Sequence, residues 1–175
     1  QIMLQFAAEM RRKHGFRMAE FSPGGGFAIQ YTRDKPAPPV ADYAETIASA
    51  LLEQCHLLGL DQPRLIIEPG RAIVGRAGVA LYTVGAEKVI PGVRHYVSVD
   101  GGMADNIRHA LYGAKHEAVV ANKMREREEG KVTIAGKLCE SGDILIENIA
   151  LPPVSAGDII AVADCGAYCL PLASN

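Results

Sequence analysis

The spacing of apolar residues predicts two helices in the first part of the chain. Residues 2–14 carry apolar side chains three and four positions apart, the period of one helix face, and Gly15 follows as a left-handed cap. Residues 42–58 repeat this spacing, with a capping box from Asp42 to Glu45 at the start and Gly59 at the end. The apolar face of the second helix comprises Tyr43, Ile47, Leu51, Leu52, Cys55 and Leu58.

A short apolar run follows each predicted helix and ends in a polar or glycine-rich loop. The first run, 16–21, precedes Ser22–Gly26, and the second, 65–68, precedes Pro69, Gly70 and Arg71. Such runs are typical of buried parallel strands, which deliver polar groups to the carboxyl edge of a sheet. Repeated βα units predict a (β/α)8 barrel or a doubly wound sheet. Two units cannot close a barrel, so we expect these residues to be part of a longer protein.

The pattern changes after Arg76. Five short β-rich runs follow, separated by glycine and proline turns, at 79–84, 95–99, 131–135, 144–147 and 158–163. This pattern predicts an all-β second domain, a sandwich or a partly open barrel. The expected fold class is therefore α/β plus all-β. We expect the end of a (β/α)8 TIM barrel at 1–76 and a β-rich domain at 77–175.

Composition and charge exclude several classes of function. The 175 residues are 49% hydrophobic and 22% charged, with a net charge of −2 and no basic block, which argues against a nucleic-acid surface. No apolar stretch reaches the roughly 18–20 residues of a membrane span. No signal peptide opens the chain, so we expect a cytoplasmic protein. The four cysteines form no disulfide framework, and the five scattered histidines predict no metal site.

The two loops at the strand ends suggest a site for a phosphorylated cofactor. Gly24, Gly25 and Gly26 could form only a tight turn, or their backbone N–H groups could donate to a phosphate. Glu68 could form a structural salt bridge with Arg71, or it could serve the cofactor. From the residues alone both readings remain open.

Five motifs occur in order along the chain and together carry a family resemblance. They are PGGGFAIQY (23–31), EPGR (68–71), VDGGMADNIRHALYGA (99–114), GKLCESGDIL (136–145) and GDIIAVADCGAYCLPLASN (157–175). In these motifs the chain resembles the pyridoxal-phosphate decarboxylases of the alanine-racemase-like barrel group and, within that group, the diaminopimelate decarboxylases. The resemblance implies a cofactor-binding barrel followed by a β-domain. It also implies that the lysine that holds the cofactor lies outside these residues.

The resemblance implies a cofactor role for six residues. Gly26 would contact the phosphate, and Gly70 and Arg71 would face the phosphate or a substrate carboxylate. The Glu68 carboxylate would keep the pyridine nitrogen protonated, so that the ring accepts electrons. Tyr168, otherwise a core aromatic residue, would touch cofactor and substrate. Pro69 completes the cofactor-binding set.

The resemblance also implies how the substrate is held. Arg108 and Tyr112 lie four residues apart and share a face if the stretch is helical, where they would hold the distal carboxylate of the substrate; otherwise they are a solvent-facing arginine and a half-buried tyrosine. The family has a proline where this chain has His109. Cys139, which we expect to be exposed in a polar loop, would donate the proton that replaces carbon dioxide. Glu140 would accept the distal ammonium group. In the family Cys139 and Glu140 reach into the site of the partner subunit, which implies a homodimer.

The implied reaction is decarboxylation of meso-diaminopimelate to L-lysine and carbon dioxide. Alternatives are a related decarboxylase of ornithine- or arginine-type substrates, a non-catalytic homologue of the same fold, and a stand-alone β-rich module. We expect the 175 residues in isolation to fold poorly and to lack activity. Cys55, Cys165 and Cys169 are expected to be packing residues.

Overall fold

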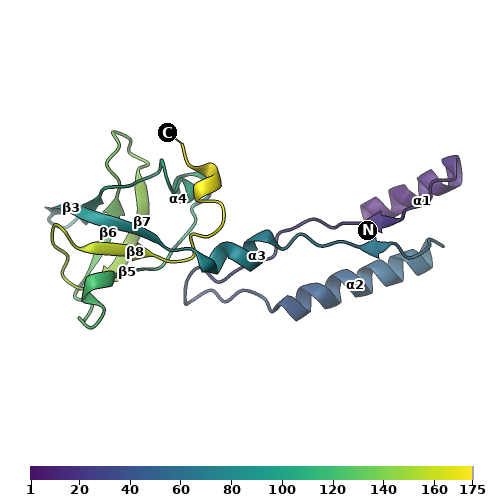
Figure 1. The fold of residues 1–175 in the computed structure, drawn as a ribbon, viewed down its shortest axis with the longest axis horizontal. Helices are drawn as coiled ribbons and strands as arrows, with labels where there is room; N and C mark the ends of the chain where they lie inside the picture. The colour runs from purple at the N-terminus through teal and green to yellow at the C-terminus, as the bar shows by residue number, and fades with distance from the viewer. Residues whose placement is uncertain (175) are drawn as a thin grey trace. The chain divides into compact units, whose positions relative to one another are not determined.

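The computed structural model describes residues 1–174, which form two compact units. Unit 1 comprises 1–28 and 37–70. Unit 2 comprises 29–36 and the chain from Arg71 onward. The short segment 29–36 thus leaves unit 1 and packs with the second half of the chain. Figure 1 shows both units along the chain.

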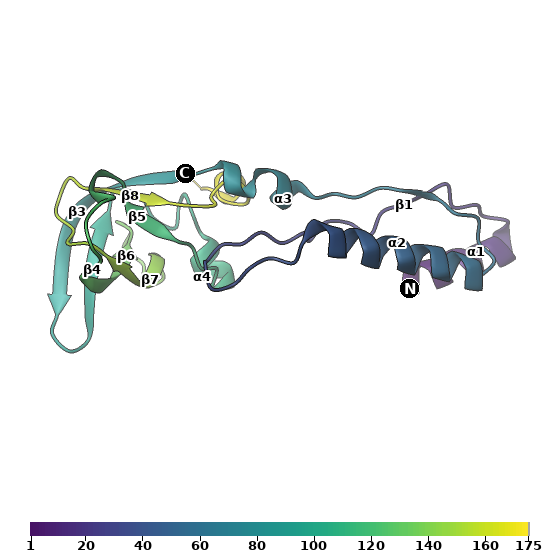
Figure 2. The ribbon, with the colours of Figure 1, turned by 90° about the horizontal axis from the view of Figure 1, so that it is seen from below.

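Unit 1 contains two helices and two short parallel strands (Figure 2). They are α1 (Ile2–His14), β1 (Glu20–Phe21), α2 (Val40–Leu57) and β2 (Arg64–Leu65). Glu20 pairs with Arg64 and Phe21 with Leu65 in parallel. The order of helices and strands predicted from the sequence is confirmed, although each strand is shorter than expected.

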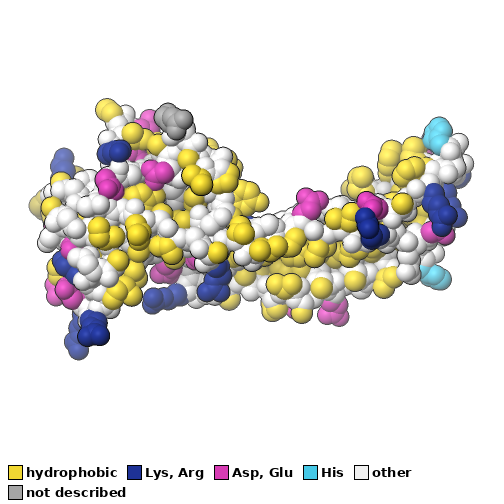
Figure 3. Space-filling model, viewed as in Figure 1, with side chains coloured by type: hydrophobic (Ala, Val, Ile, Leu, Met, Phe, Trp, Pro, Cys, Tyr) yellow, Lys and Arg dark blue, Asp and Glu magenta, His cyan; other side chains and the backbone are white. Residues whose placement is uncertain are grey.

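The small core of unit 1 joins α1 to α2. Leu4 of α1 packs with Leu51 and Cys55 of α2, and Phe21 of β1 lies against this cluster. Several apolar side chains of unit 1 remain exposed, among them Ile2, Met3, Phe6, Val40, Leu52 and Leu57. Figure 3 shows hydrophobic side chains on the surface of the molecule. Unit 1 therefore buries only part of its apolar surface.

The helix ends differ in one respect from the sequence pattern. Gly15 and Gly59 adopt positive φ angles of 65° and 62°, as expected for residues that end helices. The predicted capping box is wrong, because α2 begins at Val40 after Pro39 and no side chain caps it. Asp42 lies within the first turn instead, where a negative charge is favoured by the helix dipole.

Unit 2 is built on a six-stranded sheet that forms a near-closed barrel, with strand order β5-β8-β3-β4-β6-β7. The strands are β3 (Ala80–Ile90), β4 (Arg94–Val99), β5 (Ala118–Val120), β6 (Gly130–Ala135), β7 (Ile144–Leu151) and β8 (Ile159–Val162). β4 and β6 are parallel, and the other pairs are antiparallel. β5 and β7, at the two ends of the order, contact one another. The five predicted β-rich runs are confirmed; β5 was missed because three residues are too short to form a pattern.

The long strand β3 bends the sheet into a barrel. Residues 80–83 pair with β8, whereas 84–90 pair with β4, and the register shifts between Val84 and Ala86. Such a bulge at Gly85 increases the local twist and lets one strand serve both sides of the barrel.

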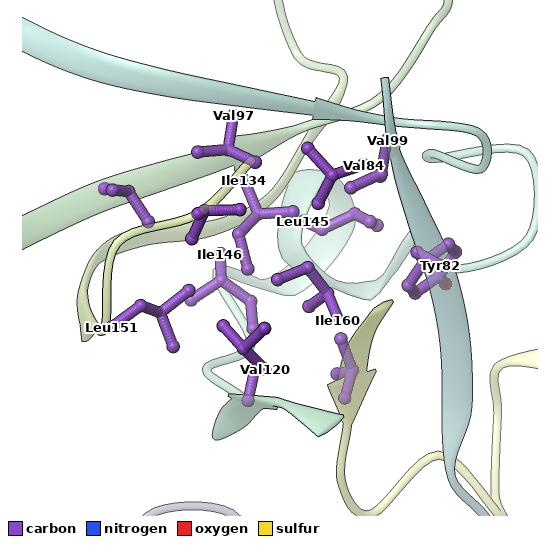
Figure 4. Packing of buried hydrophobic residues seen from close by; sticks show 14 residues of the cluster. Tyr82, Val84, Val97, Val99, Val120, Ile134, Leu145, Ile146, Leu151 and Ile160 are labelled. Carbon is purple, nitrogen blue, oxygen red and sulfur yellow. The ribbon is translucent and has the colours of Figure 1, made fainter. Parts of the chain in front are cut away.

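Buried aliphatic side chains fill the inside of this barrel (Figure 4). The cluster comprises Tyr82, Val84, Val97, Val99, Ala118, Val120, Val132, Ile134, Leu145, Ile146, Leu151, Val154, Ile160 and Val162. Full burial of each large apolar side chain contributes roughly 1.5–3 kcal/mol, so this core supplies most of the stability of unit 2.

Short helices connect the strands of unit 2. They are α3 (Gly70–Val74), which begins at the last residue of unit 1, η1 (Gly75–Ala77), α4 (Arg108–Tyr112), η2 (Ala121–Lys123) and η3 (Leu170–Leu172). None of the helices in the described part of the chain combines the length and the apolar character that a membrane span requires.

Candidate functional site

The glycine loop and Glu68 lie side by side in unit 1. Because β1 and β2 are parallel and in register, the segments that follow them leave the same edge of the sheet. Ser22 Oγ donates a hydrogen bond to Glu68 Oε1 at 2.7 Å, and Gly24 N donates to Ser22 Oγ at 3.1 Å. The expected meeting of an acid with a glycine loop at this edge is confirmed.

The glycine loop has the backbone geometry of an anion cradle. Gly24 and Gly26 have φ angles of 85° and 91°, which L side chains rarely adopt. A Cβ on Gly25 would lie 2.8 Å from the carbonyl oxygen of Glu68, so only glycine fits there. Among the described residues, the N–H groups of Gly25 and Gly26 donate to no protein acceptor. Free backbone donors beside a carboxylate fit the phosphate and ring nitrogen of pyridoxal phosphate.

Pro69 follows Glu68 in the same loop, Gly70 begins α3, and the second segment of unit 2 starts at Arg71. Arg71 lies in the first turn of α3 and is half-buried. No group of three or more potential metal ligands occurs among residues 1–174.

Arg108 and Tyr112 begin and end the short helix α4, so the expected helical turn is confirmed. His109, where the resemblance implies a proline, lies within this turn, with its Nδ1 3.3 Å from the carbonyl oxygen of Ala114. The two residues differ in environment: Arg108 is only 6% exposed, whereas Tyr112 is 66% exposed. The alternative of a solvent-facing arginine is therefore wrong.

The guanidinium group of Arg108 lies over aromatic rings. Its Cζ is 5.0 Å from the ring centroid of Tyr31 and 5.8 Å from that of Tyr168. Tyr168 has a positive φ of 61° and is half exposed, so it is not the core aromatic residue of the alternative reading. A tyrosine held at positive φ is unusual, and such strain is often found at functional sites.

Cys139 and Glu140 lie in the loop between β6 and β7, and both are exposed, as expected. The carboxylate of Glu140 accepts hydrogen bonds from Ser141 Oγ and Gly142 N within its own loop. The Gly142 bond is the main reason why the pKa of Glu140 is lowered, so its carboxylate is charged at neutral pH. A charged, exposed acid is suited to bind an ammonium group from outside the loop.

Asp143 organises this loop from within. Its carboxylate is buried and accepts the N–H of Met103 at 2.6 Å and the N–H of Leu138 at 2.7 Å. A Cβ on Gly102 or Gly136 would collide with this carboxylate, so both positions require glycine. Asp143 was not identified from the sequence, where its signal was an acid that occurs together with two glycine-containing turns.

The three remaining cysteines are packing residues, as expected, and two of them, Cys165 and Cys169, also influence each other's pKa. Cys55 and Cys169 are buried, and Cys165 packs against the barrel core. The Cys165 Sγ donates to the carbonyl oxygens of Val162 and Ala163, and the Cys169 Sγ donates to that of Ala167. Interaction between the two thiols lowers the pKa of Cys169, with a further contribution from the positive charge of Arg108, and it raises the pKa of Cys165.

Two further residues near Arg108 were not singled out from the sequence. Tyr31 comes from the segment 29–36, and His116 packs its ring against that of Tyr31. Tyr31 is far from Arg108 in the sequence, and His116 belongs to none of the five motifs, so only the folded chain brings them together.

Comparison with known proteins places the chain in a family. The family described as "Pyridoxal-dependent decarboxylase, C-terminal sheet domain" matches residues 28–166. The diaminopimelate decarboxylase of Bacillus subtilis (strain 168) is 50% identical over 167 residues, which are 95% of this chain and 38% of the relative. The chain thus spans little more than a third of the length of that relative.

Solved structures agree with this assignment. The diaminopimelate decarboxylase of M. jannaschii in co-complex with L-lysine is 35% identical, with a TM-score of 0.86, and the match covers 98% of this chain and 38% of that chain. A lysine/ornithine decarboxylase of Vibrio vulnificus complexed with putrescine has a TM-score of 0.77 at 22% identity, over 99% of this chain and 46% of that chain, which shows a shared fold. The chain therefore belongs to the pyridoxal-dependent decarboxylase family and carries its C-terminal sheet domain.

Proposed function

We propose that this chain is part of an enzyme that removes the carboxylate from the D-configured centre of meso-diaminopimelate and yields L-lysine and carbon dioxide. The observation that carries the proposal is the contact between the glycine loop and Glu68 at the edge of parallel strands, within a chain of this family. The 50% identity to a diaminopimelate decarboxylase supports the choice of substrate.

We propose that unit 1 forms the last βα units of a (β/α)8 barrel. Two parallel strands of two residues cannot form a stable sheet alone, and their helices leave apolar side chains exposed. Further βα units would cover these side chains. The barrel portion is assigned to 1–76 and the β-domain to 77–175.

Pyridoxal phosphate, when bound, supplies a ring that accepts the electron pair of the bond to the departing carboxylate. Glu68 holds a proton on the ring nitrogen through its negative charge, and Ser22 orients the carboxylate of Glu68. The N–H of Gly26 donates to the phosphate, and Pro69, Gly70 and Arg71 complete the cofactor contacts.

The substrate is held at both ends of its distal amino-acid group. Arg108, Arg71 and Tyr112 bind the distal carboxylate, and Glu140 binds the distal ammonium. Tyr168 contacts both substrate and cofactor. The Sγ of Cys139 delivers the proton to the carbon that has lost carbon dioxide. The exposed, charged state of Glu140 and the exposure of Cys139 support these roles.

We propose that the enzyme is a homodimer in which Cys139 and Glu140 act in the site of the partner subunit. The hydrogen bonds of the Glu140 side chain stay within its own loop, which leaves its outer face free for a ligand of the partner. A mixing experiment tests this proposal. Cys139→Ser and Glu68→Gln variants, inactive alone, should regain about a quarter of wild-type activity when subunits exchange at random. Activity that stays absent after verified exchange would contradict a shared site.

The main rival is a decarboxylase of a substrate without a distal carboxylate, such as ornithine. Arg108 argues against it, because a buried guanidinium with no carboxylate partner among the described residues requires an anion. A cation-binding acid would suffice for the distal end of ornithine. The likeness to lysine/ornithine decarboxylase concerns the fold and does not favour that substrate.

Carbon dioxide release decides among these functions. The protein from the complete reading frame is incubated with pyridoxal phosphate and either meso-diaminopimelate or L-ornithine, and the isolated 175 residues serve as a comparison. We expect release from meso-diaminopimelate alone, and none from the isolated chain. Release from L-ornithine would favour the rival, whereas neither release nor cofactor absorbance would leave a non-catalytic homologue.

A further inference from the structure

Arg108 is the most deeply buried arginine or lysine of unit 2, and it has no ion-pair partner among the described residues. It is 6% exposed, its Nε makes no hydrogen bond, and its backbone N–H donates to Asn106 Oδ1 at 3.4 Å. A buried guanidinium is costly unless its charge is compensated. The side chains around the guanidinium group of Arg108 therefore determine its orientation and which ligand it can bind.

The closest aromatic ring belongs to Tyr31. The Cζ of Arg108 lies over this ring at 5.0 Å from the centroid, closer than the 5.8 Å to the ring of Tyr168. The negative face of an aromatic ring attracts a guanidinium, and the attraction is strongest when both are shielded from water. Unlike a carboxylate, a ring holds the cation without neutralising it, so the guanidinium can still bind an anion.

The ring of Tyr31 is itself held in place. The His116 ring meets it edge to face, with centroids 5.1 Å apart and planes at 75°. His116 is 4% exposed, and its Nδ1 donates to the carbonyl oxygen of Ala163 at 3.0 Å. Burial lowers the pKa of His116, with a smaller contribution from Arg108, so the ring is neutral and does not repel the guanidinium.

The backbone of the Tyr31 segment is anchored to the same strand region. The backbone N–H of Arg33 donates a hydrogen bond to Glu117 Oε1 at 3.0 Å. The backbone oxygen of Glu117 in turn accepts the N–H of Ala163, the residue whose carbonyl oxygen binds His116. Segment 29–36 therefore belongs to the scaffold of the β-domain, although it lies next to the glycine loop in the sequence.

We propose that Tyr31 is a positioning residue that holds the guanidinium of Arg108 for the distal carboxylate of the substrate, and that His116 fixes the Tyr31 ring. This inference rests on the proposed function and adds a specificity element to it. The pair does not touch the reacting atoms. It determines how well a ligand with a carboxylate is distinguished from one without.

The test compares two ligands that differ in this carboxylate. L-Lysine retains the distal carboxylate and ammonium groups, whereas cadaverine lacks the carboxylate. In the full-length enzyme with cofactor, Tyr31→Leu should raise the KM for meso-diaminopimelate and the inhibition constant of L-lysine roughly tenfold, the effect of losing a shielded cation–π contact. The inhibition constant of cadaverine should stay unchanged, and Tyr31→Phe, which keeps the ring, should resemble the wild type.

Two controls separate positioning from general damage. Tyr96→Leu removes a similar contact elsewhere in the barrel, where the Cζ of Arg94 lies 5.7 Å from the Tyr96 centroid, and should leave both inhibition constants unchanged. If Tyr31→Leu fails to fold, 3,5-difluorotyrosine at position 31 keeps the shape of the ring but weakens its negative face. The fluorinated enzyme should then bind L-lysine more weakly and cadaverine as before.

The outcomes distinguish this inference from the proposed function. A wild-type enzyme that decarboxylates meso-diaminopimelate, together with Tyr31 variants that bind L-lysine normally or lose both ligands equally, would overturn this inference alone. A wild-type enzyme that neither decarboxylates meso-diaminopimelate nor binds L-lysine would overturn the proposed function and this inference with it.

Discussion

The buried carboxylate of Asp143 accepts the backbone N–H of Leu138 at 2.7 Å, one residue before Cys139. Its other oxygen accepts the N–H of Met103, so one side chain ties the loop of Cys139 to the turn after β4. The position of the proposed proton donor therefore depends on an acid that does not react.

Asp143→Asn should destabilise the β-domain and slow catalysis. Asparagine has one acceptor oxygen where two N–H groups need acceptors, so one donor is left buried and unsatisfied, at a cost of roughly 1–3 kcal/mol. Displacement of Cys139 should lower kcat about tenfold or more. Denaturant unfolding and steady-state kinetics measure both effects. Asp61→Asn, which removes only an exposed ion pair with Arg17, should change stability by less than about 1 kcal/mol.

Gly26→Ala should weaken cofactor binding more than Gly24→Ala does. Both glycines have strongly positive φ angles and open space at the Cβ position, so both substitutions impose similar backbone strain of about 1–2 kcal/mol. Only the N–H of Gly26 is proposed to contact the phosphate. Titration of each variant with pyridoxal phosphate measures the difference, and equal affinities would remove Gly26 from the cofactor site.

Glu68→Gln should lower kcat by roughly a hundredfold or more, because a neutral amide no longer keeps the ring nitrogen of the cofactor protonated. Ser22→Ala removes the 2.7 Å hydrogen bond that orients Glu68 and should have a milder effect, about tenfold or less. Kinetics at saturating cofactor separate this effect from loss of binding. A Glu68→Gln enzyme with normal kcat would show that Glu68 serves another purpose.

Asp158 should make the β-domain sensitive to acid. A hydrogen bond from Lys123 Nζ, followed by bonds from Asn122 Nδ2 and Ser155 N, lowers the pKa of Asp158 below its ordinary value of 3.8. Because the folded pKa lies below the unfolded one, this stabilisation is complete above pH 3.8 and is lost as the pH falls further.

Asp158→Asn should therefore be less stable than the wild type at neutral pH and should lose less stability on acidification. Breaking this buried network should cost roughly 2–4 kcal/mol at neutral pH. Unfolding curves measured between neutral pH and pH 3 give the dependence of the free energy of unfolding on pH for the variant and for the wild type. Glu53→Gln, at an exposed position of α2, serves as the control and should keep the wild-type slope. Parallel pH profiles for Asp158→Asn and the wild type would contradict the assigned role.

Local pattern was sufficient for much of this protein. Helical spacing determined α1 and α2, and alternation of apolar runs with glycine and proline turns located five of the six barrel strands. The meeting of the glycine loop with Glu68 also followed from sequence, because two successive parallel strands deliver their following loops to one edge. The exposure of Cys139 followed from its polar neighbours. The capping box failed because local pairs of residues do not determine where a helix after Pro39 begins.

Only the tertiary structure determined which distant side chains surround the proposed substrate groups. From the sequence alone a surface position for Arg108 stayed open as an alternative, yet the folded chain buries it against Tyr31 and Tyr168, which lie far apart in the sequence. His116 likewise carries no local pattern that reveals its contact with Tyr31. Hydrophobic period and turn chemistry act over a few residues and are written in the sequence, whereas contacts among loops depend on how the whole barrel closes.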